Sequence, residues 1–175
     1  MSATALIMRA ERTVPLVLTL QTGLRYREKH RRQRQLANRR ELQQLARLRL
    51  SEAEHLYAKG LHDGATYLCG YVVEFALKAR ICKLLKLKNY PDTGKIGNLF
   101  KTHNFDDLKL LAGLSEEVTA AKNPELFANW SIAKSWEPEQ RYSAPGTSDR
   151  KKAQDALASI KDDPNGVLTW LSKRW

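Results

Sequence analysis

A long apolar stretch in the first half of the chain constrains the fold more than any other feature. If residues 65–87 are wound as a helix, apolar side chains cover nearly its whole circumference. One face of that helix consists of Ala65, Leu68, Cys69, Val72, Val73, Ala76 and Ala79. A helix of this kind is buried on more than one side, so the stretch predicts the central helix of an all-α bundle.

Two charged residues interrupt this apolar stretch. Glu74 and Lys78 lie four residues apart, away from the main apolar stripe. If the pair is exposed, it is an ordinary helical ion pair that contributes roughly 0.3–0.5 kcal/mol. If it is buried, each charge needs a partner, and clustered buried charges are a feature of functional sites. Both interpretations remain open at the level of the sequence.

The rest of the chain also reads as helices. Helical periodicity predicts segments over 38–59, 61–86, 105–112 and 115–136, a segment capped by Thr147 or Ser148 that ends near Asp163, and a last short helix near 167–171. Residues 88–102 and 137–146 are predicted loops, and no window alternates like a strand. The predicted fold is therefore an all-α, antiparallel bundle of about five helices.

The net charge of +11 is concentrated near the N-terminus. Residues 1–50 contain 12 Lys or Arg and 3 Asp or Glu, whereas residues 51–175 contain 18 and 16. We therefore expect two parts, a basic N-terminal extension over residues 1–37 and the bundle over residues 38–175. The basic run within the extension has the composition of a nucleic-acid-binding arm, although a solvated helical extension would look the same.

Cysteine, histidine and hydropathy patterns give mainly negative predictions. Cys69 and Cys82 lie on the same apolar helix, roughly 20 Å apart, so they cannot form a disulfide with each other. Reduced, buried cysteines are typical of a cytoplasmic protein. The histidines lack zinc-ligand spacing, and we predict no metal and no cofactor. The apolar segment at residues 14–20 is too short to span a bilayer, so no membrane interaction is expected.

Three further signatures follow one another in the chain. The first begins at Asp63 and leads into Val-Glu-Phe-Ala-Leu-Lys-Ala at residues 73–79; the second is Lys-Thr-His-Asn-Phe-Asp-Asp-Leu at residues 101–108; the third is Arg141-Tyr142, before a Pro/Gly loop and a final helix. Together they resemble the HEPN domain family, whose name stands for higher eukaryotes and prokaryotes nucleotide-binding, over roughly residues 40–172. The resemblance implies a bundle of four or five helices that usually dimerises.

The family resemblance also implies a functional context. Many prokaryotic members look like toxins or defence proteins encoded beside a small nucleotidyltransferase, and others resemble nucleotide-binding modules. The ribonuclease branch carries an Arg followed four to six residues later by a His. No His follows Arg141 here, because His103 is the last one in the chain. The usual ribonuclease motif is therefore absent from the final helices. Its spacing occurs from Arg25 to His30, but that match lies in the wrong segment, in an arginine-rich run where it is expected by accident. Whether the chain is an enzyme stays open.

Three residues are candidates for catalysis under this resemblance. In a metal-independent ribonuclease, a ribose 2′-hydroxyl would attack the adjacent phosphate. Arg141 would stabilise the developing charge, and His103 or Glu74 would accept the proton. The structural alternatives are that His103 fixes a helix start and that Arg141 ties its loop to Glu74.

Further residues are candidates for binding RNA or a nucleotide. Tyr142 can stack on a base, and cationic side chains can hold phosphate. The binding candidates are Lys78, Tyr142, Arg31, Arg32 and Arg34. We expect a cytoplasmic homodimer that binds RNA or a nucleotide within a toxin–antitoxin or defence system. The alternative is a non-catalytic dimeric module that partners a nucleotidyltransferase, with Gly70 allowing another backbone to approach the central helix.

Overall fold

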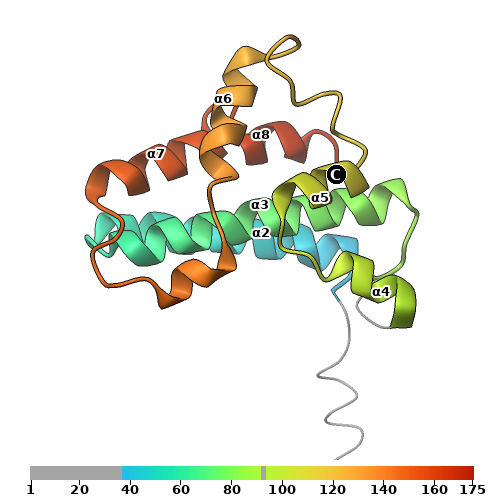
Figure 1. Cartoon of the computed structure of the whole chain (residues 1–175), viewed down its shortest axis with the longest axis horizontal. Helices are drawn as coiled ribbons and strands as arrows, with labels where there is room; N and C mark the ends of the chain where they lie inside the picture. Colours follow the sequence, from blue (N-terminus) through green and yellow to red (C-terminus); the bar gives the residue numbers. More distant parts are fainter. Residues whose placement is uncertain (1–36, 92–93) are drawn as a thin grey trace, which may run out of the picture. The chain divides into compact units, whose positions relative to one another are not determined.

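The computed structural model describes residues 37–91 and 94–175 of the chain, and every regular element among them is helical (Figure 1). The elements are α2 (Arg39–Ala58), α3 (His62–Leu84), α4 (Gly94–Phe100), α5 (Phe105–Leu111), α6 (Pro124–Ala133), the 3-10 helix η1 (Pro138–Tyr142), α7 (Arg150–Lys161) and α8 (Val167–Ser172). The predicted all-α fold is confirmed. None of the described helices is both long and apolar enough to cross a membrane.

The first two helices form an antiparallel hairpin. Asn38 and Glu41 start α2 with a capping box, in which each side chain accepts a hydrogen bond from the other residue's backbone amide, at 3.1 and 2.9 Å. Gly60 adopts a φ of 76°, a left-handed conformation that favours glycine, and this allows the chain to turn back into α3. Both helices were predicted to within two residues at each end.

The helix α3 is the centre of the bundle. It packs against α2, α5, α6, α7, α8 and η1 (Figure 1). Its side chains Val72, Val73, Leu77 and Ile81 are completely buried. Burying a side chain of this size stabilises the fold by about 1.5–3 kcal/mol, so the apolar stretch supplies much of the energy that holds the other helices in place.

The absence of a side chain at Gly70 allows the Trp136 ring to pack directly against α3. A Cβ atom at Gly70 would lie 2.0 Å from Trp136 Cδ2, and the Trp136 Nε1–H donates a 3.0 Å hydrogen bond to the Tyr67 carbonyl. The expectation that Gly70 admits the backbone of another chain was wrong, because the Trp136 indole fills this position. The contact anchors the chain immediately before η1 and so fixes where η1 lies against α3.

Tertiary contacts override local sequence signals at α4. The sequence predicted a loop here because of two glycines, yet α4 forms. Phe100 packs edge-on against Tyr90, with ring centroids 5.7 Å apart. The Tyr90 hydroxyl also donates a 2.8 Å hydrogen bond to the Phe100 carbonyl. These contacts hold the end of α4 against the rest of the bundle.

Three other local predictions were wrong. Residues 137–146 were predicted as a loop, but the 3-10 helix η1 forms at Pro138–Tyr142. Residues 115–122 form successive turns rather than the start of a helix. The cap of α7 is Asp149, whose carboxylate accepts the Lys152 amide at 2.7 Å, rather than Thr147 or Ser148. Both residues stabilise the preceding loop instead. The Thr147 hydroxyl donates to the Ala144 carbonyl, and the Ser148 amide donates to the Asp63 carboxylate.

Candidate functional site

Glu74 is a buried carboxylate with two cationic or polar partners. Its residue is 2% exposed. Oε1 lies 2.6 Å from Lys78 Nζ, and Oε2 lies 2.9 Å from His103 Nδ1. The Lys78 side chain is also largely buried, and its ammonium lies 5.1 Å from the centroid of the Tyr90 ring. The predicted pair at 74 and 78 therefore exists, but inside the protein rather than as a solvated surface pair.

His103 reaches this carboxylate because the start of α5 is fixed. Asn104 is the N-cap of α5, and its side chain accepts the amides of Asp106 and Asp107 at 2.9 and 3.1 Å. The His103 side chain is 47% exposed. Its Nδ1 is held by Glu74, and no partner for Nε2 is found within residues 37–91 and 94–175. An imidazole held this way can present Nε2 to a proton or an anion.

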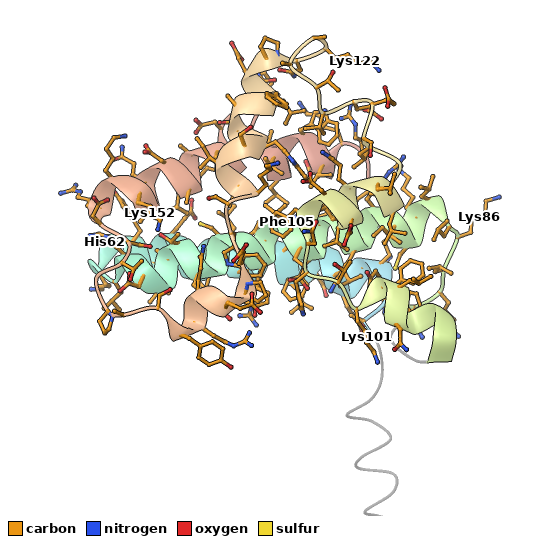
Figure 2. The ribbon with its side chains drawn as sticks, viewed as in Figure 1. His62, Lys86, Lys101, Phe105, Lys122 and Lys152 are labelled. Atoms are coloured by element: carbon orange, nitrogen blue, oxygen red, sulfur yellow. The ribbon has the colours of Figure 1, made fainter. Side chains whose placement is uncertain are left out.

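An open cleft lies in front of His103. We call it the His103 cleft; its volume is about 470 Å³, and its lining includes His103, Phe105, Asp106, Lys134, Trp136, Glu137 and Glu139. Phe105 is labelled in Figure 2. A hydrogen bond from Lys109 lowers the pKa of Asp106, which therefore stays ionised. Three carboxylates line this cleft, an arrangement that disfavours phosphate.

A second cleft opens beside Arg141 on η1. We call it the Arg141 cleft; its volume is about 380 Å³, and its lining includes Asp63, Tyr67, Gln140, Arg141, Ser148 and Lys152. The Arg141 guanidinium carbon lies 4.7 Å from the centroid of the Tyr142 ring. Tyr142 is 77% exposed. The neighbouring Tyr142 and Tyr67 raise the pKa of Arg141 above its usual range, so Arg141 remains a cation.

Asp63 shapes the Arg141 cleft from the start of α3. Its carboxylate accepts the Gly146 amide at 2.6 Å and the Ser148 amide at 2.7 Å. These two hydrogen bonds lower the pKa of Asp63 below its usual range. The carboxylate is thereby occupied by the loop, which leaves Arg141 and Lys152 as the cations that line the cleft.

The candidates fall into two groups. The structure brings Glu74, Lys78 and His103 together, but no hydrogen bond or ion pair joins Arg141 to Glu74 or His103 within the part of the chain that the structure describes. Instead, Arg141 donates to the Pro138 carbonyl at 3.2 Å. The predicted contact between Arg141 and Glu74 is thus not found within the chain.

Tyr71 lies between the two groups. Its hydroxyl is 2.9 Å from the Tyr67 hydroxyl, and the charges of both Glu74 and Arg141 act on it. Burial raises the pKa of Tyr71 to about 12, so it remains a neutral phenol at physiological pH.

Most of the residues predicted to bind RNA or a nucleotide lie outside the two clefts or outside the described part of the chain. The Lys78 side chain is 11% exposed and lies between Glu74 and the Tyr90 ring, so it offers little surface to RNA, and its binding role stays a prediction. Arg31, Arg32 and Arg34 lie outside the described residues.

Sequence reasoning missed several residues of the Arg141 cleft. Tyr67 could have been found, because it shares a helical face with Tyr71 and Glu74. Asp63 and Lys152 carry no comparable signal, since their places in the cleft depend on how α7 and its loop pack against α3.

Neither the curated proteins nor the solved structures include a significant match to this sequence. The sequence model of the HEPN domain matches residues 40–162, which is more than half of the chain. The matched range contains both groups of candidate residues, together with the helices that position them. The chain therefore belongs to the HEPN domain family.

Proposed function

We propose that this HEPN-domain protein binds RNA or a nucleotide and holds phosphate in the Arg141 cleft. The observation that carries this proposal is the exposed Arg141 guanidinium, which lies over the Tyr142 ring and lines a cleft together with Lys152. Family membership supports a function related to nucleotides or RNA.

The chemistry of the Arg141 cleft suits a phosphorylated ligand. A guanidinium offers two parallel N–H donors to phosphate, and Lys152 adds a second positive charge. The exposed Tyr142 ring offers a face on which a base can stack, a contact worth about 1–3 kcal/mol. Asp63 does not oppose binding strongly, because two backbone amides already occupy its carboxylate.

Binding fits the geometry better than cleavage does. A ribose 2′-hydroxyl can attack phosphate only if a proton acceptor and a stabilising cation meet at the same phosphate. Arg141 and His103 line different clefts, and the His103 cleft is rich in carboxylates. Both oxygens of Glu74 are engaged by its neighbours, so its role is to hold His103 and Lys78.

The family resemblance supports a biological setting for this binding. We propose a homodimer that acts in a prokaryotic toxin–antitoxin or defence system. A second candidate function is a non-catalytic dimeric module that partners a nucleotidyltransferase, and the absence of any His after His103 favours it. Co-purification from native cells distinguishes the two, since a protein that retains no partner would exclude the interaction module.

The direct test is RNA binding by fluorescence anisotropy, with AMP and ATP as competitors. Loss of a charged hydrogen-bonding group costs about 1.5–3 kcal/mol, so Arg141→Ala should weaken binding by about 10- to 100-fold. The affinity of Arg141→Lys for RNA should lie between those of the wild type and Arg141→Ala. Lys173→Ala, which removes an exposed cation at the end of α8, is the matched control and should bind like the wild type.

The same samples test cleavage on a denaturing gel. Equal affinity of wild type and Arg141→Ala would overturn the Arg141 cleft as the binding site. RNA cleavage by the wild type that disappears in His103→Ala would contradict binding as the sole function.

A further inference from the structure

The start of α2 and the end of α3 meet at one end of the hairpin. The Tyr90 amide donates to the Ala37 carbonyl at 3.0 Å, and Asn38 pairs with Asn89 in an isolated bridge. The Tyr90 hydroxyl bonds the Phe100 carbonyl, which brings the residue after α4 to the same end. Five exposed cations gather there: Arg39, Arg40, Lys86, Lys88 and Lys101. We call this group the basic end, and Figure 2 labels Lys86 and Lys101.

Among the residues that the structure describes, no carboxylate forms an ion pair with the cations of the basic end. Residues 75–91 contain no Asp or Glu, and Glu41 at the start of α2 is occupied by the capping box. A surface with this charge attracts polyanions.

The arginines of the basic end oppose the ordinary preference of a helix start. The N-terminus of a helix carries partial positive charge, so acidic residues are favoured in its first turn. Here Arg39 and Arg40 are the first two residues of α2, and Glu41 is the only acidic residue of that turn. Helix formation alone does not explain two cations at these positions.

Lys86 breaks a second local rule at the same surface. Its φ of 53° is left-handed, just past the end of α3, where glycine is the usual residue. The Leu87 amide closes the helix there with a 2.9 Å hydrogen bond to the Cys82 carbonyl. A lysine in this conformation is strained, and strain retained at a surface position points to a function of the side chain.

The two arginines at the start of α2 and the left-handed Lys86 lie on the same surface. Residues that oppose local folding preferences are expected at functional sites. We propose that the basic end binds the phosphate backbone of RNA, on a surface separate from the Arg141 cleft. This inference rests on the proposed RNA-binding function and extends it to a second contact region.

An anionic membrane is the main rival ligand, because Leu84 and Leu85 are 42% and 46% exposed among the cations. A membrane-surface helix, however, carries its cations along the flanks of one broad apolar face. The cations here come from three separate segments: the start of α2, the turn after α3 and the residue after α4. That arrangement suits a chain of phosphates better than a flat lipid surface.

The test uses the full chain and a labelled single-stranded RNA, with affinity measured across KCl concentrations. Lys86→Gly relieves the strained backbone while removing a cation, so it should weaken binding without lowering Tm. Lys86→Gly with Lys88→Ala should weaken binding about tenfold and reduce the salt slope by about 1.4, as expected for two lost phosphate contacts. Lys59→Ala with Lys122→Ala removes two exposed cations from other parts of the protein and should change neither the affinity nor the slope.

Two of the possible outcomes distinguish failure of the basic end from failure of the Arg141 cleft. An unchanged slope in the basic-end variants, with binding lost in Arg141→Ala, would overturn the basic end and leave the Arg141 cleft standing. The reverse pattern would support the basic end and overturn the Arg141 cleft. Binding to phosphatidylserine vesicles without binding to RNA would overturn both RNA proposals.

Discussion

Glu74 Oε2 lies 2.9 Å from His103 Nδ1, and this contact joins the central helix to a loop 29 residues further along the chain. The other oxygen of the same carboxylate holds Lys78. Two of the three HEPN-like signatures therefore meet at one buried carboxylate. We interpret this cluster as the element that sets the position of α5 against α3, and with it one wall of the His103 cleft.

Removing the Glu74 carboxylate should destabilise the fold strongly. Glu74→Ala leaves the buried Lys78 ammonium without its counter-ion, and losing one member of a buried pair costs about 3–5 kcal/mol. Replacing both members with apolar residues, in Glu74→Leu with Lys78→Met, should recover most of that loss. Urea unfolding measures the free energies; a single variant as stable as the wild type would show that the pair does not support the bundle.

The Gly70 position should tolerate no side chain. In an open helix, Gly→Ala is favourable by about 1 kcal/mol, but here the new Cβ would collide with the Trp136 ring. We expect Gly70→Ala to lower the free energy of unfolding by about 1–3 kcal/mol. Gly64→Ala on the same helix is the control, because its Cβ would meet only the flexible tip of Leu56, at 3.1 Å. Equal stability of the two variants would contradict the packing described here.

The fold could be predicted from sequence where local and tertiary signals agree. The start of α2 was predicted to within one residue, and Asn38, Asn104 and Asn123 cap their helices through bonds within one turn. The all-round apolar character of α3 likewise predicted its central place. At α4, long-range contacts determine the secondary structure. The glycines of this segment predicted a loop, but a helix forms whose last residue, Phe100, packs on Tyr90.

The candidate site shows the same division. The proximity of Glu74 to Lys78 follows from helical spacing, whereas the contact of Glu74 with His103 depends on how α5 packs against α3. The separation of Arg141 from both could not be read from the sequence. It depends on Trp136 sitting on Gly70, which fixes η1 in a place where its successive residues line different clefts.

The ionised Asp63 carboxylate should make the stability of the fold depend on pH in the acid range. Backbone amides lower its folded-state pKa, so the folded protein holds the ionised carboxylate more strongly than the unfolded chain does. This contribution is complete above the unfolded pKa of about 3.9 and is lost as the pH falls through the lower folded pKa. Asp63→Asn should therefore lower Tm at neutral pH and flatten its fall in acid. Glu139→Gln controls for the loss of one exposed carboxylate. If Tm of Asp63→Asn falls in acid as steeply as that of the wild type, Asp63 does not contribute in this way.

The cysteines should be unreactive in the folded protein. Burial raises the pKa of Cys69 to about 12 and that of Cys82 to about 11, so almost no thiolate forms at pH 8. A thiol reagent such as DTNB should label neither residue in native buffer and both in guanidinium chloride. Rapid labelling of the native protein would show that α3 opens readily and is not the rigid centre of the bundle.

The central claim is that RNA or a nucleotide binds in the Arg141 cleft. Titrating the ¹⁵N-labelled protein with a short RNA, and following the amide resonances, tests it most directly. If RNA binds there, the largest shifts within the bundle occur at residues 140–148 and at Tyr67, with smaller shifts around the basic end. Shifts confined to His103 and its neighbours, or no shifts at all, would contradict the claim.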